Sequence, residues 1–174
     1  MIRGILTLLT AKGKRALASS VLWFSIYALS GIVMMLLVLK MLDLIMTEQE
    51  ISLYADWLAL VLLLLLRGIS STFGDLRKHY AGFDLNYELR EKIIHRLKSF
   101  SLGFYTNERL GEISTVIHRD VDNMVMIVGH LCPRMLSDFI VSAVMITALL
   151  IVNGNMGLLM ISILPVALLI LRNL

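Results

Sequence analysis

The chain has 174 residues, of which 58% are hydrophobic and 17% are charged, and its mean hydropathy is +0.83. Soluble domains are about 45–50% apolar, so this composition excludes an ordinary soluble globular protein and indicates an integral membrane protein. The single cysteine excludes a disulfide framework, and the acids interleaved with the basic residues argue against a nucleic-acid partner.

The N-terminal part combines a basic segment with a charge-free stretch. Residues 1–15 contain a short apolar run, Ile2–Leu9, followed by three basic residues, which predicts a cytoplasmic segment with a helix lying on the membrane surface. Residues 16–39 carry no charge and are longer than the apolar core of a signal peptide. We therefore expect a retained first transmembrane helix at 16–39.

The second predicted span covers residues 53–74, with Tyr54 and Trp57 suited to the aromatic belt at the outer interface. The stretch 43–56 contains acids and no basic residue, whereas 75–134 contains more than half of the 16 lysines and arginines. By the positive-inside rule, the N-terminus and residues 75–134 are cytoplasmic.

Arg67 is a charge inside this second span. Such a residue can line a substrate path and meet an anionic substrate, or it can extend its long side chain to the inner headgroups. The sequence leaves both interpretations open.

A helical pattern continues beyond the second span into polar sequence. Apolar or aromatic residues recur every three or four positions from Leu76 to Leu97 and again from Ile113 to Met135. A helix over 75–99 would extend about 36 Å into the cytoplasm. We expect residues 75–134 to form a long cytoplasmic helical hairpin, interrupted at Gly82 and bent or restarted at Pro133.

Two further spans are predicted at 135–152 and 156–171, separated by the turn signal at Asn153–Asn155. The predicted fold is therefore all-α and integral to the membrane. It has four transmembrane helices, with the cytoplasmic helical hairpin between spans two and three.

The polar segment FYTNERLG, residues 104–111, lies at the tip of this hairpin. Gly103 precedes the segment and Gly111 ends it, and Thr106 or Asn107 can cap a short helical turn between these glycines. Phe104 and Tyr105, at an otherwise exposed tip, would anchor a contact with a cytosolic protein.

Three motifs around the tip, Phe104-Tyr105, Gly111-Glu112 and Asp120-Val121-Asp122, follow one another in a characteristic order and spacing. They resemble the first intracellular loop of ATP-binding cassette (ABC) exporter-type permeases. The resemblance implies a coupling helix at about 105–111 that lies against a nucleotide-binding domain. The contact residues it implies are Phe104, Tyr105, Thr106, Asn107, Glu108, Arg109, Leu110 and Gly111.

The chain departs from the family pattern at two positions. Thr106 stands where an Asp often follows the aromatics, and Val116 stands where an Arg is usual. Both departures leave the fold expectation intact but remove the basis for assigning individual salt bridges. In addition, the segment GHLCP, Gly129–Pro133, resembles a subgroup that includes siderophore transporters working as heterodimers.

The chain contains no phosphate-binding G-x-x-x-x-G-K-[ST] motif, so we expect no ATPase chemistry from its own residues. The resemblance implies that ATP and Mg²⁺ bind at a nucleotide-binding domain located elsewhere. It also implies six spans and a second transmembrane half, identical or different, in the cell membrane. Because only four spans are predicted and the chain stops at LLILRNL, we favour a fragment or truncated product over a subunit for which partner chains supply the rest.

Other chemistry-bearing residues have plainer interpretations. We expect Glu112, Asp120 and Asp122 to be solvated or ion-paired rather than catalytic or metal-binding, because the two aspartates do not share a helix face. The four histidines show no i,i+4 pairing, and the 11 methionines suit packing. The competing functional hypothesis is a non-transporting membrane scaffold or regulatory protein whose cytoplasmic tip docks a partner.

Overall fold

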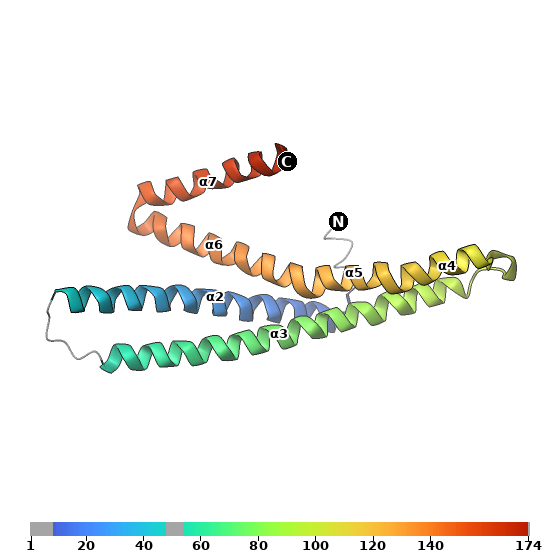
Figure 1. Ribbon diagram of the computed structural model, residues 1–174, viewed down its shortest axis with the longest axis horizontal. Helices are drawn as coiled ribbons and strands as arrows, with labels where there is room; N and C mark the ends of the chain where they lie inside the picture. Colours follow the sequence, from blue (N-terminus) through green and yellow to red (C-terminus); the bar gives the residue numbers. More distant parts are fainter. Residues whose placement is uncertain (1–8, 48–53, 174) are drawn as a thin grey trace.

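The computed structural model describes residues 9–47 and 54–173, with the backbone alone at 102 and beyond 163. The expected surface helix at Ile2–Leu9 falls almost entirely outside these residues. The described part is helical throughout and contains no strand, in agreement with the all-α prediction. Its helices are α2 (Ala11–Met46), α3 (Tyr54–Leu97), α4 (Asn107–Thr115), α5 (Val121–Met126), α6 (Cys132–Val152) and α7 (Gly154–Asn173) (Figure 1).

Helices α2 and α3 lie side by side and antiparallel (Figure 1). The Ser20 hydroxyl donates to the Gly74 carbonyl at 2.9 Å, and ten residues along both helices Thr10 meets Asp84 at 2.8 Å. The two contacts are ten residues apart on each helix, so α2 and α3 keep the same register between them. At the opposite end of the pair, Lys40 and Asp56 form a salt bridge of 2.9 Å.

The chain returns from the hairpin tip as one long helix over Asn107–Val152. Two π-helical turns lie within it: η2 (Val116–Asp120) and η3 (Ile127–Leu131). Pro133 is expected to bend or restart the helix; a new α-helical segment, α6, does begin at Cys132 directly after η3, with Pro133 in its first turn, but without a break in the helix. Proline has no backbone N–H. At the change from π-helical to α-helical hydrogen bonding, that N–H would have no regular carbonyl partner, so its absence does not break the helix.

Gly82 does not interrupt α3 as predicted; it lies at a close crossing of two helices. A Cβ atom at Gly129 would lie 3.4 Å from the Gly82 Cα, and Gly82 and Gly129 are both buried. Because neither residue has a side chain, the backbones of α3 and η3 can approach closely. Gly82 therefore lies within a continuous helix at a packed crossing and does not end the helix.

A buried apolar cluster surrounds this crossing and ties it to the start of α2. It gathers residues from the beginning of the chain, the middle of α3 and η3, of which Leu85 is 0% and Val128 is 1% exposed. The start of the first long helix is thus fixed against the base of the hairpin. The members of the cluster are Leu9, Ala16, Leu17, Ala81, Leu85 and Val128.

Three helices among the described residues are long and apolar enough to cross a membrane: α2, α3 and Asn107–Val152. They contain the first three predicted spans. The fourth predicted span lies within α7, where the searched apolar part, Gly154–Ile163, is shorter. Large apolar side chains on these helices are widely exposed; Leu64, for example, is 62% exposed. Such a surface is suited to lipid rather than water.

Candidate functional site

The hairpin tip projects beyond the rest of the described structure (Figure 1). Thr10, at the start of α2, is level with Asp84, and α3 continues to Leu97. Thirteen further residues of α-helix correspond to about 20 Å. The last part of α3 is therefore a continuous helix that holds the tip well away from the start of α2.

The connection between α3 and α4 is short and internally hydrogen-bonded. After α3 ends, a 3₁₀ turn, η1 (Leu102–Phe104), reverses the chain. Thr106 has extended backbone and its side chain accepts a hydrogen bond from the Arg109 N–H at 3.3 Å. This is an N-cap, as the sequence predicts, and it satisfies one of the free donors at the start of α4.

The tip aromatics pack on one another. The rings of Phe100 and Phe104 stack with centroids 4.2 Å apart, and Tyr105 meets Phe104 edge-on at 5.6 Å. The guanidinium of Arg109 lies over the Phe104 ring, 4.6 Å from its centroid. These contacts make Phe104 half-buried, so the ring stabilises the tip itself and is not a freely projecting anchor.

Tyr105 has a second structural role, because its hydroxyl donates to the Leu97 carbonyl at 2.5 Å. This carbonyl, in the last turn of α3, also accepts from the Phe100 N–H at 3.0 Å, so it receives two hydrogen bonds from the segment that follows the helix. The end of α3 is thereby joined to the segment that leads into α4.

The returning helix does not stop where the sequence suggests. The predicted turn ends at Gly111, but α4 begins at Asn107 and continues through Gly111 to Thr115. Nothing lies within 4 Å of a Cβ placed on Gly111. The glycine is therefore not required there by a close neighbour, and the helix continues past it. The exposed surface of the tip thus includes the first turns of a long helix, where the exposed residues are Asn107, Glu108, Arg109, Leu110 and Gly111.

The Asp120-Val121-Asp122 element contacts α3 within the hairpin. Arg90 of α3 and Asp122 of α5 form a salt bridge of 3.1 Å, and Val121 beside it is 4% exposed. In the Asp120-Val121-Asp122 element the apolar residue therefore faces the hairpin interior, and Asp122 pairs across it. Asp120 lies 3.5 Å from Arg119. Both aspartates are ion-paired, as predicted.

Arg67 lies against α2. Its guanidinium is 4.2 Å from the centroid of the Tyr27 ring, and it packs directly on the helix at Gly31. Neither contact is near a helix end, since Tyr27 and Gly31 are in the middle of α2. In this conformation the charge sits along the apolar length of the helix pair. No carboxylate among the described residues forms an ion pair with it.

The structure also brings together two histidines that sequence spacing does not connect. The rings of His79 and His130 meet edge-on, with centroids 5.3 Å apart, beside the Gly82–Gly129 crossing. A pair is fewer ligands than a structural metal site requires. Within residues 9–47 and 54–173, no group of three or more His, Cys, Asp or Glu is placed to hold a metal.

The GHLCP segment has a structural explanation in this fold. Gly129 makes the close approach to α3, and Pro133 occupies the first turn of α6. Both residue types are therefore accounted for by packing and helix geometry, without reference to a class of substrate.

The chain was compared with known protein families. The family described as ABC transporter transmembrane region matches residues 16–172. A search of curated proteins finds no match. The matched region includes α3, the hairpin and α6, so it covers the tip and both helices that carry it.

Proposed function

Because the chain belongs to the ABC transporter transmembrane region family, we propose that it acts as the permease part of an ATP-driven transporter and couples ATP-dependent motion to substrate movement through its hairpin tip. The family match is the observation that carries this proposal. A membrane scaffold would need only the projecting tip to dock a partner. Membership of the family favours a transporter over such a scaffold.

In the proposed topology the chain lies in the cell membrane. Its N-terminus and residues 75–134 are on the cytoplasmic side. The charge asymmetry between the 43–56 stretch and the hairpin supports this orientation. The proposed complete machine has four spans from this chain, further spans from the rest of the permease, and a second transmembrane half.

The proposed partner of the tip is a nucleotide-binding domain that binds ATP and Mg²⁺. Exposed residues on the first turns of α4, Glu108 and Leu110 above all, would contact it; Leu110 is 47% exposed. The stacked rings of Phe100 and Phe104 would transmit force by keeping the tip rigid. A stiff connection is required because a push on a loose loop would move only the loop.

Arg67 is proposed to line the substrate path. A guanidinium within an apolar helix pair, held on an aromatic ring and without a carboxylate partner among the described residues, suits an anionic group on the substrate. This proposal concerns the substrate class and is independent of the role of the tip.

The test of coupling uses the complete transporter in proteoliposomes. Leu110→Asp should lower substrate-stimulated ATPase activity and transport about tenfold or more, because it places a charge in the docking surface. The matched control is Met126→Asp, since Met126 is also an exposed apolar residue, 55% exposed, and lies about 24 Å along the same helix. Equal activity of Leu110→Asp and the wild type, at equal expression, would contradict the coupling role.

A further inference from the structure

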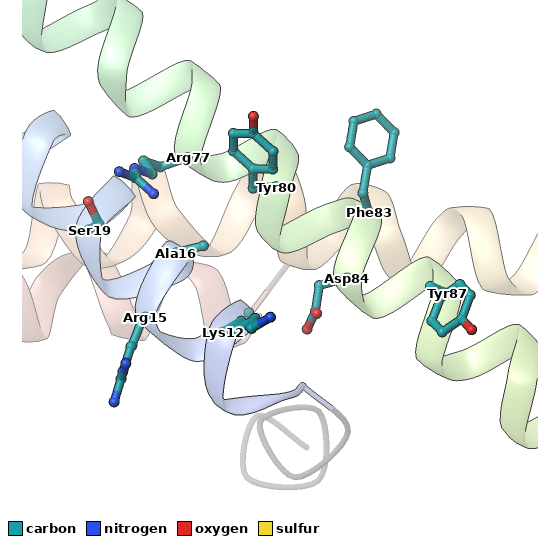
Figure 2. Close-up of a pocket in the computed structure, with 10 residues that line it drawn as sticks. Lys12, Arg15, Ala16, Ser19, Arg77, Tyr80, Phe83, Asp84 and Tyr87 are labelled. Atoms are coloured by element: carbon teal, nitrogen blue, oxygen red, sulfur yellow. The ribbon is translucent and has the colours of Figure 1, made fainter.

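An open groove of about 740 Å³ lies between the first turns of α2 and the middle of α3 (Figure 2). Lys12, Arg15 and Ser19 line it from α2, at spacings of three and four that place them on one helix face. Arg77 lines it from α3, and Figure 2 shows its side chain extending toward α2 near Ser19. The constant register of the two helices keeps these residues level with one another.

The groove has an excess of positive charge. No ion pair among the described residues includes Lys12, Arg15 or Arg77. The lining contains one acid, Asp84, and its carboxylate accepts hydrogen bonds from the N–H and the hydroxyl of Thr10. Three cations therefore line an open groove whose one carboxylate already accepts hydrogen bonds at the start of α2, and an anion would complement them.

The same two helix faces become apolar in the direction of the predicted spans. Trp23 follows Ser19 by four residues on α2, and Phe73 precedes Arg77 by four on α3. The rings of Trp23 and Phe73 stack with centroids 5.2 Å apart. The surface thus has a basic end and an aromatic end, which is the polarity of a lipid molecule.

We propose that this groove binds an anionic glycerophospholipid. Its phosphate lies at the basic end of the groove, among Lys12, Arg15 and Arg77. Its acyl chains run past Trp23 and Phe73. A free phosphate would use only the basic end, so the adjoining aromatic pair favours a lipid. The inference rests on the membrane topology given under the proposed function, but not on coupling to ATP.

The experiment follows Trp23 fluorescence in mixed micelles of the full chain. The chain has two tryptophans, so a Trp57→Phe background makes Trp23 the only emitter. Brominated phosphatidylglycerol should quench Trp23 at a lower mole fraction than brominated phosphatidylcholine. Arg15→Gln with Arg77→Gln should reduce this preference about tenfold or more, since each basic residue adds to the attraction for anionic lipid.

Two controls separate a specific groove from general surface charge. Lys14→Gln removes a charge from the same segment, but Lys14 does not line the groove, so its effect should not exceed the roughly fivefold that one charge near the membrane surface contributes. Arg15→Lys with Arg77→Lys keeps the charge and should keep most of the preference, which also tests folding of the doubly substituted chain. Circular dichroism should show unchanged helix content in each variant.

Three results would overturn the proposal. They are an absence of preference for phosphatidylglycerol in the wild type, an equal loss in Lys14→Gln and the double glutamine variant, and displacement of the lipid by inorganic phosphate. None of them involves nucleotide. A lipid preference in a chain whose Leu110→Asp variant still couples normally would therefore support the groove while contradicting the proposed role of the tip.

Discussion

The hydroxyl of Thr10 lies 2.8 Å from the carboxylate of Asp84, 74 residues further along the chain. The Thr10 side chain also accepts from the Gly13 N–H at 3.1 Å, so it caps α2 while it is itself held by α3. The carboxylate of Asp84 therefore stands at the N-terminus of α2, where the helix dipole favours negative charge. A side chain on Gly13 would collide with this carboxylate, which explains the glycine.

We predict that Asp84→Ala destabilises the chain by about 1–3 kcal/mol, because the half-buried Thr10 donors lose their acceptor. The change is measured as the free energy of unfolding in detergent by denaturant titration. Glu91→Ala is the control, since Glu91 is an exposed acid of α3 outside the ion pairs of the described residues. Equal effects of the two substitutions would show that the cap has no special contribution.

The Gly82–Gly129 crossing predicts how large a side chain at position 129 can be before the protein is destabilised. A Cβ atom at Gly129 would lie 3.4 Å from the Gly82 Cα and 3.7 Å from the Lys78 carbonyl, both ordinary contacts. Gly129→Ala should therefore change the unfolding free energy by less than about 1 kcal/mol. Gly129→Val adds methyl groups that meet α3 and should cost about 1–3 kcal/mol. Similar stabilities for the two variants, measured by the same titration, would argue against close packing here.

Thr106→Ala should loosen the tip, because the Arg109 N–H loses its cap. The expected cost is about 1 kcal/mol, or about fivefold faster hydrogen exchange of the Arg109 amide if exchange proceeds by local opening. Thr106→Ser keeps an acceptor oxygen and should leave exchange nearly unchanged. If alanine and serine variants exchange alike, the side chain does not cap α4 in solution.

Arg67→Leu tests the substrate path in the complete transporter. For an anionic substrate we expect the KM for transport to rise about tenfold or more, while the maximal ATPase rate without substrate stays unchanged. Tyr27→Phe keeps the ring on which Arg67 lies and should leave the KM unchanged, whereas Tyr27→Leu should raise it. An unaltered KM in Arg67→Leu would assign Arg67 a packing role.

Much of the candidate site followed from the sequence around residues 104–111. The Thr106 cap is local chemistry, because the acceptor and the donor are three residues apart. The helix end at Gly111 was wrong, since a single exposed glycine costs too little to end a helix that continues with good periodicity. The partial burial of Phe104 was also missed. It depends on how the 3₁₀ turn aligns Phe100 with it.

The family match to residues 16–172 agrees with the resemblance read from three short motifs. Those motifs did not reveal the Arg90–Asp122 salt bridge, which joins residues 32 positions apart across the hairpin. The basic groove was missed as well. Its cations are divided between the start of α2 and the middle of α3, and each group alone looked like an ordinary membrane-flanking charge.

The amino-acid sequence by itself determined the membrane class, the helical character and the approximate positions of the long apolar helices, because hydropathy and helical periodicity are properties of neighbouring residues. Only the tertiary structure decided which faces meet. The Thr10–Asp84 cap, the Gly82–Gly129 crossing and the contact of Arg67 with Tyr27 each join distant segments. Their geometry depends on the relative register and rotation of two helices, and no single helix contains that information.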